Sequence, residues 1–355
     1  MGSTDSHIIF AINPGSTSTK LALARGGSIV DSETLHHDES QLKKYPRVWD
    51  QYHFRRDACK QWAAARTKTC SAVVSRGGLL RPLPGGTYSV NDLMLRDAHA
   101  NLQGEHVSNL SCHLASQSAA DYRCPAFVVD PVSVDEFADL ARYSGHPLIE
   151  RRSLSHALSI HATARKAARK LGKPYEQSSF VVAHMGGGIS IAPVLRGKII
   201  DANDAASDGP FSAERTGGLP LQQFISLCMS GKYAEHELRS MVMGNGGLMA
   251  YLGSNNALEI ERKILEGDEQ ARRIYEAMAY QIAKEIGAMA TVVRGSVDAV
   301  VLTGGLAQSV LLVSWLKRRV EFIARVMVIK EDNEMEALVS GAMRVLQGEE
   351  RAKEY

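Results

Sequence analysis

Cysteine pairs and long apolar runs are both missing from this chain. It has five cysteines, and no two form the Cys-x-x-Cys pair typical of zinc sites. Their odd number, and the lack of a secretory signal pattern, favour free thiols in a reducing, cytoplasmic environment. No stretch approaches the about 18 consecutive apolar residues of a membrane-spanning helix. We therefore expect a soluble protein without structural zinc and without a membrane partner.

An excess of charge of one sign is also missing. The 41 basic and 39 acidic residues leave a net charge of +2 at pH 7. Nucleic-acid-binding proteins usually carry a basic excess or a basic stripe, so a nucleic-acid partner is not expected. The 355 residues are enough for two domains, each with its own core.

Two common nucleotide-binding motifs are absent. After Gly15 the sequence reads Ser-Thr-Ser-Thr-Lys-Leu, which lacks the second glycine and the final hydroxyl of a Walker loop. No Gly-x-Gly-x-x-Gly opens a helix, which disfavours a Rossmann site. The stretch "INPGSTSTK" instead predicts a tight hairpin between two strands. Its backbone N–H groups, hydroxyls and Lys20 could face one anion, with a polar surface hairpin as the alternative.

The pattern of this first segment occurs a second time. "HIIFAINPGSTSTKLALARGGSIVD" (7–31) and "SFVVAHMGGGISIAPVLRGKIID" (179–201) share the same order of features. Both read strand, polar residue, glycine turn, strand, Arg-Gly turn, short strand and Asp. Internal repeats determine architecture, so the sequence favours a duplicated unit with a seam near residue 150.

Helix signals lie between and after the repeats. Apolar residues at steps of three and four predict a long helix over about 269–293. "SVDEFADLARY" carries Ser133 three residues before Glu136, the pattern of a helix start. "DAVVLTGGLAQS" (298–309) predicts a strand, a glycine turn and a helix, and "NEMEALVSGAMRVL" predicts a closing helix.

Further glycine turns and two loop arginines strengthen the phosphate interpretation. "HMGGGIS" and "TGGLAQS" each follow an apolar strand, and glycine lets the backbone approach a ligand closely. Arg215 lies in "GPFSAERTGGLP" and Arg76 in "SRGGLLRPLPGG", both among turn residues. The planar guanidinium suits phosphate because it donates two parallel hydrogen bonds. Either arginine could equally be a surface residue.

Taken together, these motifs resemble the butyrate kinase family of acetokinases. The segments that carry the resemblance run from residue 8 to the last residue: INPGSTSTK, SRGGLL, EHVSNL, FVVDPVSVDE, HMGGGIS, GPFSAERTGGLP, AMAYQIAKEIG, VDAVVLTGGLA and LQGEERAKEY. The family belongs to the superfamily of acetate and sugar kinases, heat-shock ATPases and actins. The resemblance implies an α/β fold with a duplicated βββαβα unit and an interdomain nucleotide cleft. The expected domains are 1–150, joined by a C-terminal helix in 335–355, and 151–334.

The resemblance also implies an activity and a set of partners. The expected reaction is reversible, direct in-line phosphoryl transfer between ATP and butanoate, which gives ADP and butanoyl phosphate with the help of Mg²⁺. A homodimer is expected as well. Isobutanoate, isovalerate, propanoate or acetate remain open as the substrate. A nucleotide-gated binding protein of the actin or heat-shock ATPase class is the remote alternative.

Roles are carried over residue by residue from the resemblance. The expected catalytic residues are Arg76, Arg215, His156 and His184. The expected phosphate- and nucleotide-binding residues are Asn13, Gly15, Ser16, Ser18, Lys20, Gly186, Gly187, Gly188, Gly304 and Gly305. The expected acids near the metal are Asp130 and Glu334.

One position departs from the acetate kinase pattern. An essential arginine of those enzymes corresponds here to Val73, whereas the arginine of this chain lies three residues later, in Arg76-Gly77-Gly78. We therefore expect Arg76 to supply the charge from a shifted position.

Overall fold

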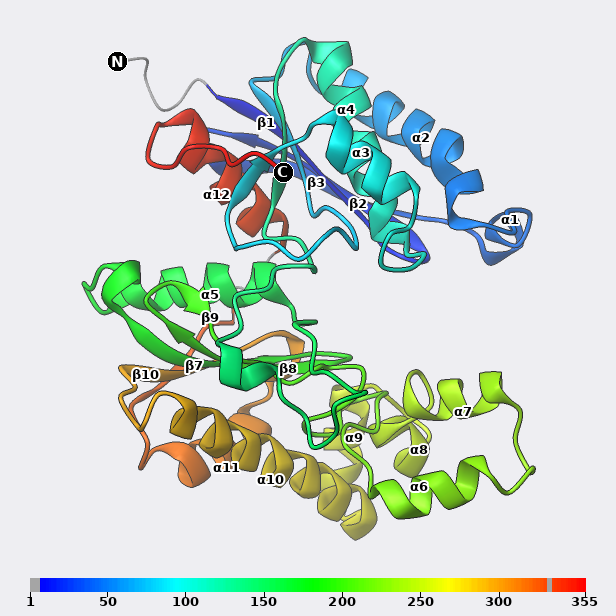
Figure 1. Ribbon diagram of the computed structural model, residues 1–355, viewed down its shortest axis with the longest axis vertical. Helices are drawn as coiled ribbons and strands as arrows, with labels where there is room; N and C mark the ends of the chain where they lie inside the picture. The colour runs from blue at the N-terminus through cyan, green and yellow to red at the C-terminus, as the bar shows by residue number, and fades with distance from the viewer. Residues whose placement is uncertain (1–6, 331–333) are drawn as a thin grey trace. The chain divides into compact units, whose positions relative to one another are not determined.

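The computed structural model describes residues 7–330 and 334–355, and the chain divides into two compact units. The first unit extends to Asp135 and also takes up the C-terminal segment that ends at Tyr355, while Glu136 begins the second unit. In Figure 1 the red helix α12 accordingly lies with the blue strands of the first unit. The sequence placed the seam near residue 150; that the two units are folding domains remains our proposal.

The first unit contains a six-stranded sheet in the order β3-β2-β1-β4-β6-β5. β1, β2 and β3 form an antiparallel meander, β4 and β6 run parallel to β1, and β5 is antiparallel to β6. The strands are β1 (Ile8–Pro14), β2 (Ser18–Arg25), β3 (Ser28–His36), β4 (Ala72–Ser75), β5 (Thr87–Ser89) and β6 (Ala126–Val129).

The second unit repeats this topology. Its five-stranded sheet has the order β11-β10-β7-β8-β9, with β7, β8 and β9 antiparallel and β10 and β11 parallel to β7. Strand for strand, this matches β6-β4-β1-β2-β3 of the first unit, so the duplication expected from the sequence is confirmed. The strands are β7 (Ser179–Met185), β8 (Ile189–Leu195), β9 (Lys198–Ile199), β10 (Ala299–Thr303) and β11 (Val326–Val328).

Helices cover both faces of the first sheet. α12 packs on β1, β4 and β6, and α4 lies on the opposite side of the same strands, with α2 packed against α4 and β2 (Figure 1). The helices of this unit are α1 (Glu39–Leu42), η2 (Val48–Gln51), α2 (Tyr52–Ala64), α3 (Asp92–His99), η3 (Val107–Asn109), α4 (Leu110–Tyr122) and α12 (Glu334–Leu346).

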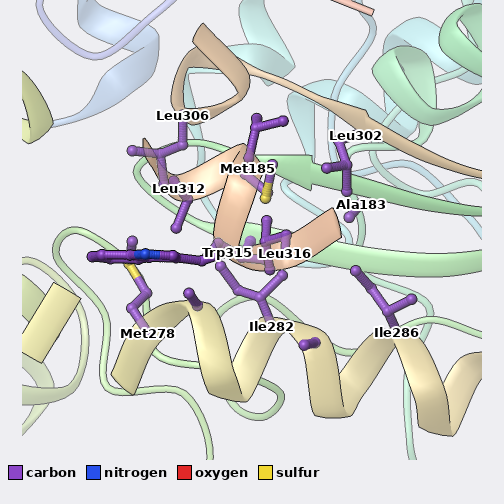
Figure 2. Close-up of a cluster of buried hydrophobic side chains, with 14 of the residues drawn as sticks. Ala183, Met185, Met278, Ile282, Ile286, Leu302, Leu306, Leu312, Trp315 and Leu316 are labelled. Carbon is purple, nitrogen blue, oxygen red and sulfur yellow. The ribbon is translucent and has the colours of Figure 1, made fainter. Parts of the chain in front are cut away.

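In the second unit, α5 packs on one face of the sheet and α10 on the other (Figure 1). Figure 2 shows the core on the α10 side, where Met278, Ile282 and Ile286 meet α11 residues such as Trp315 and Leu316. The helices of this unit are η4 (Asp139–Arg142), α5 (Ala157–Lys170), η5 (Tyr175–Gln177), α6 (Leu221–Cys228), α7 (Glu235–Val242), α8 (Gly247–Leu252), α9 (Ala257–Leu265), α10 (Glu269–Val292), η6 (Gly305–Gln308) and α11 (Val310–Val320). Within the described ranges, no helix is both long and apolar enough to cross a bilayer.

The helix predicted to start at Ser133 is wrong, since only the short η4 forms in that segment. Both residues of the expected capping pair make tertiary contacts instead. The Ser133 hydroxyl accepts from the backbone N–H of Leu80 at 3.3 Å. The Glu136 carboxylate accepts from the N–H of Ile199 at 2.8 Å and lies 3.4 Å from His161 Nε2. These distant partners outcompete the local cap.

Candidate active site

The expected site residues of the first unit gather at one edge of its sheet. Asn13 lies near the end of β1, Arg76 follows β4, Asp130 follows β6 and Glu334 begins α12. β1, β4 and β6 are parallel, so their carboxyl ends meet at the same edge. In open α/β sheets this edge is where ligands bind.

Glu334 joins two of these residues. Asn13 Nδ2 donates to Glu334 Oε2 at 2.7 Å, and Arg76 Nη1 lies 3.2 Å from Glu334 Oε1. Val73, by contrast, is fully buried in β4 and pairs with Phe10 of β1. The structure therefore brings the shifted Arg76, and not position 73, to the carboxyl edge of the sheet.

The β1–β2 hairpin presents the polar turn at the same edge. Its register pairs Asn13 with Lys20 and Pro14 with Thr19, and the N–H of Gly15 donates to the carbonyl of Ser18 at 2.8 Å. The side chains of Ser16 and Lys20 are exposed, and Ser18 is half-buried. Because Asn13 and Lys20 are cross-strand neighbours, their side chains leave the same face of the sheet.

Asp130 is held in an unusual backbone conformation. Its φ of 40° lies in the left-handed region, which non-glycine residues rarely adopt. Two hydrogen bonds to Gly86 fix it: the Gly86 N–H donates to Asp130 Oδ1 at 2.6 Å, and the Asp130 N–H donates to the Gly86 carbonyl at 3.0 Å. Asp130 is only 4% exposed, so its carboxylate has a single well-defined orientation.

The C-terminal segment contacts Gly86 and Thr87, next to Asp130. The sequence analysis did not predict these contacts. Gly86 has a φ of 139°, a conformation that favours glycine, and a Cβ there would lie 2.9 Å from Lys353 Cε and 3.2 Å from Glu350 Oε1 of the C-terminal segment. The N–H of Thr87 donates to Glu350 Oε1 at 3.0 Å, and the N–H of Lys353 donates to the Thr87 carbonyl at 2.8 Å. The motif LQGEERAKEY was the only sequence signal for this contact.

His106 is another residue that the sequence reasoning passed over. Its Nδ1 lies 2.7 Å from the hydroxyl of Ser108, and burial together with the charge of Arg76 lowers the pKa of His106. A neutral imidazole therefore lies in the electrostatic field of Arg76. It belongs to EHVSNL, one of the resemblance motifs.

In the second unit the two expected histidines lie against one another. The ring centroids of His156 and His184 are 4.4 Å apart, with an interplanar angle of 33°. A hydrogen bond of 2.8 Å joins His156 Nδ1 to the hydroxyl of Ser190. Ser190 pairs with His184 across the β7–β8 hairpin, and Thr303 pairs with His184 on β10. Both histidines thus lie at the carboxyl edge of the second sheet.

Arg215 packs onto the glycine turn of that hairpin. A Cβ at Gly188 would overlap the guanidinium of Arg215, so a larger residue there would displace the arginine from this position. Ser212 holds the loop in place: its hydroxyl donates to the Gly187 carbonyl at 2.5 Å and accepts from the Arg215 N–H at 3.2 Å. Arg215 Nη1 donates to the Ala205 carbonyl at 3.1 Å, whereas its Nε is buried without a hydrogen-bond partner in the described residues.

The second glycine turn touches the first. Gly304 follows β10 with a φ of 87°, and a Cβ there would overlap the carbonyl of Met185 at the end of β7. Gly305 then begins η6. All expected residues of the second unit therefore form one continuous group, from His156 to Gly304.

Asp208 lies in the loop that leads to Arg215. Burial, followed by the negative charge of Asp204, raises the pKa of Asp208 to about 6, against an opposing effect of Arg151. Its Oδ1 is buried and has no hydrogen-bond partner within the described residues. Ionisation of this carboxyl is therefore less favourable in the folded protein than in the unfolded chain.

The two acids of the first unit suit a hydrated cation better than direct coordination. Both oxygens of Glu334 are engaged by Asn13 and Arg76, and Asp130 Oδ1 is engaged by Gly86. Within the described part of the chain, no group of three or more His, Cys, Asp or Glu side chains could ligate a metal. Mg²⁺ usually keeps several waters and needs only one or two carboxylates beside the substrate phosphates. The pair fits contact through such waters.

This chain is similar in sequence to proteins of the acetokinase family. The sequence model of the acetokinase family matches residues 141–353. A protein of Listeria monocytogenes named a probable butyrate kinase is 46% identical over 351 residues, which cover 98% of this chain and 99% of the relative. A protein of Listeria welshimeri with the same name is 47% identical over 351 residues, with the same coverage of each chain.

Solved structures agree in fold. The acetate kinase of Porphyromonas gingivalis has a TM-score of 0.79 at 18% identity and covers 96% of this chain and 100% of its own. A propionate kinase of Francisella tularensis has a TM-score of 0.74 at 16% identity and covers 94% and 98%. At such identities the likeness shows the fold alone, and it confirms the expected duplicated α/β class.

Replacing Asp208 by Asn is expected to stabilise the protein at pH 7–8. Because the pKa of Asp208 is raised in the folded state, stability falls as the pH rises from about 4 to about 6, and the loss persists above that range. The gain is at most about 3 kcal/mol and disappears near pH 4. Thermal unfolding from pH 4 to 8 measures it. Asp57→Asn, at a 64% exposed side chain, is the control; a gain independent of pH contradicts the assignment.

Proposed function

This chain belongs to the acetokinase family, whose members phosphorylate carboxylates with ATP, and we propose that butanoate is its preferred acceptor. The products are then butanoyl phosphate and ADP, and the reaction is reversible. The observation that carries this proposal is the 46% identity, over nearly the full chain, with a probable butyrate kinase. The resemblance motifs, which run through both units, support it.

The attacking group needs no general base. A short-chain carboxylate is ionised at neutral pH, since its pKa lies near that of Glu, about 4.3. Catalysis then consists of positioning the two substrates and stabilising the charge on the transferring phosphoryl group. We therefore assign neither His156 nor His184 as a base.

The first unit supplies phosphate contacts and one arginine. The hairpin residues Gly15, Ser16, Ser18 and Lys20 bind phosphate oxygens in this proposal. Arg76 stabilises the charge of the transferring group, and its ion pair with Glu334 fixes where the guanidinium points. Bound Mg²⁺ would neutralise phosphate charge, held through water by Asp130 and Glu334.

The second unit supplies the remaining contacts. Arg215 is assigned to the transferring phosphoryl group, because its Nε has no hydrogen-bond partner among the residues that the structure describes and its guanidinium already lies against the glycine hairpin. His184 donates a hydrogen bond to the same group, and His156 orients His184 through their ring contact. Gly304 and Gly305 leave room for the phosphates next to the adenosine.

We also propose a homodimer formed through the face of α6. Leu221, Ile225 and Met229 recur at steps of four, so they share one side of the helix, and they are 73%, 54% and 81% exposed. α6 and α7 bury no residue in the isolated chain. Large exposed apolar patches often mark association sites. A second copy of the chain would cover it.

The substrate assignment is tested by trapping the acyl phosphate as a hydroxamate. With Mg²⁺ and ATP, the rate is expected to peak at four carbons in a series from acetate to hexanoate plus branched acids. One methylene changes binding by about 1–3 kcal/mol, so neighbouring acids should retain activity. A peak at a branched acid contradicts butanoate while keeping the reaction. No acyl phosphate from any acid, with ATP still bound, would favour the nucleotide-gated alternative.

Arg215→Ala is expected to lower kcat by about a hundredfold or more, because a charge that acts in the transition state is lost. ATP affinity should change little. Steady-state kinetics and calorimetric ATP titration measure the two effects. Arg239→Ala removes an exposed arginine that pairs with Glu235 of the same helix, and it should behave as the wild type. An unchanged kcat in Arg215→Ala would refute the role.

Ile225→Glu with Met229→Glu is expected to convert the dimer to a monomer, because two charges would be buried in the interface. Sedimentation equilibrium measures the mass. Leu265→Glu, at an 87% exposed leucine of α9, is the control and should remain a dimer. A monomeric wild type, or a double variant that stays dimeric, contradicts the proposed interface.

A further inference from the structure

Arg55 of α2 is fully buried directly beneath the β1–β2 hairpin, and no role was expected for it. It is among the largest side chains with no exposed surface in the protein. Its Nη1 donates to the carbonyl of Gly15 at 3.0 Å and to that of Ser18 at 2.9 Å, and its Nη2 donates to the carbonyl of Ser16 at 3.0 Å. One guanidinium thus donates hydrogen bonds to three carbonyls of a single turn.

The remaining donors of Arg55 are also used. Nε and Nη2 donate to Gln51 Oε1 at 3.0 and 2.9 Å, and Nη1 donates to the hydroxyl of Thr19 at 3.0 Å. The same hydroxyl shares a hydrogen bond with His37 Nε2, 2.8 Å away. Burial, followed by the charge of Arg55, lowers the pKa of His37 to about 4, which keeps the imidazole neutral and able to accept.

These contacts fix the direction of every peptide group in the turn. The carbonyl of Thr17 accepts from the N–H of His37 at 2.9 Å, so the carbonyls of Gly15, Ser16, Thr17 and Ser18 all point into the protein. No hydrogen bond within the described residues occupies the N–H groups of Ser16 and Thr17, whose side chains are exposed. Successive outward N–H groups of this kind form an anion-binding concavity.

Among the described residues, no charged group pairs with Arg55. All its hydrogen bonds go to neutral oxygens, and none of the ion pairs in the described part of the chain includes it. The acidic group that acts on it is the Cys59 thiol, and burial raises the pKa of that thiol to about 12, so it is neutral at pH 7. Burial lowers the pKa of Arg55 only to about 10, and the guanidinium stays charged. Buried charges are normally paired.

We propose that Arg55 is the positioning residue of the phosphate hairpin, and that the phosphate group bound on the outer side of the turn supplies its missing counter-charge. This inference rests on the proposed phosphate-binding function of the hairpin. The ligand chemistry is a phosphate group, whether it belongs to ATP, an acyl phosphate or free phosphate. Arg55 itself does not touch the ligand, because the turn lies between them.

The test compares ATP with adenosine, which has no phosphate. Dissociation constants are measured by calorimetry for wild type, Arg55→Gln and Arg56→Gln. Arg55→Gln is expected to weaken ATP binding by about tenfold or more, since charge-assisted contacts depend on it, and to leave adenosine binding unchanged. Arg56→Gln removes a neighbouring, partly exposed arginine paired with Asp57, and should weaken ATP binding by less than about threefold.

The outcomes distinguish a positioning role of Arg55 from a purely structural one. Equal losses for ATP and adenosine in Arg55→Gln would mean a purely structural role and overturn the proposal, as would unchanged ATP affinity in the folded variant. If Arg55→Gln does not fold, Arg55→Lys keeps the charge but not the planar fork. It should lose about threefold or more in ATP affinity alone, and wild-type affinity there overturns the proposal. Failure of wild type to bind ATP would instead contradict the proposed function.

Parallel titrations with inorganic phosphate and ATP distinguish the source of the phosphate group. Weakening of both ligands in Arg55→Gln is expected, because each would fill the same concavity. Weakening of neither, with adenosine binding intact, overturns the proposal.

Discussion

A single buried guanidinium determines what the β1–β2 turn can offer to a ligand. A tight turn between two strands has carbonyls and N–H groups that could point either way. Arg55 takes up the carbonyls of Gly15, Ser16 and Ser18, so the N–H groups of Ser16 and Thr17 are left facing outward. The surface that "INPGSTSTK" presents is therefore fixed by a side chain far away in the sequence.

In the second copy of the duplicated unit, different contacts orient the turn between the first two strands. The β7–β8 turn is built from glycines, and its carbonyl at Gly187 accepts from the hydroxyl of Ser212. Arg215 lies on the turn instead of beneath it, with its guanidinium where a Cβ at Gly188 would lie. Equivalent turns thus have a buried, fully bonded arginine in one unit and a partly accessible arginine in the other. This difference supports a positioning role for Arg55 and a catalytic role for Arg215.

Local patterns were sufficient to predict most elements, because they encode burial and turn chemistry. The repeat of 7–31 in 179–201 and the helix near 269–293 appear in the structure as expected. The positions of Arg76 and Glu334 could be expected from motifs, but their ion pair could not, since 258 residues separate them in sequence. Arg55 lay in a polar, helical stretch without a motif, and Ser133 showed a cap pattern that tertiary contacts overrode.

Hydrogen–deuterium exchange of the β1–β2 turn tests the central claim most directly. In the free protein, the amides of Ser16 and Thr17 should exchange quickly, because no group of residues 7–330 and 334–355 accepts from them. At saturating ATP and Mg²⁺, with saturation measured by calorimetry in the same sample, both amides should become protected. Unchanged exchange of these two amides at saturation would show that the turn does not bind phosphate, and would contradict the account.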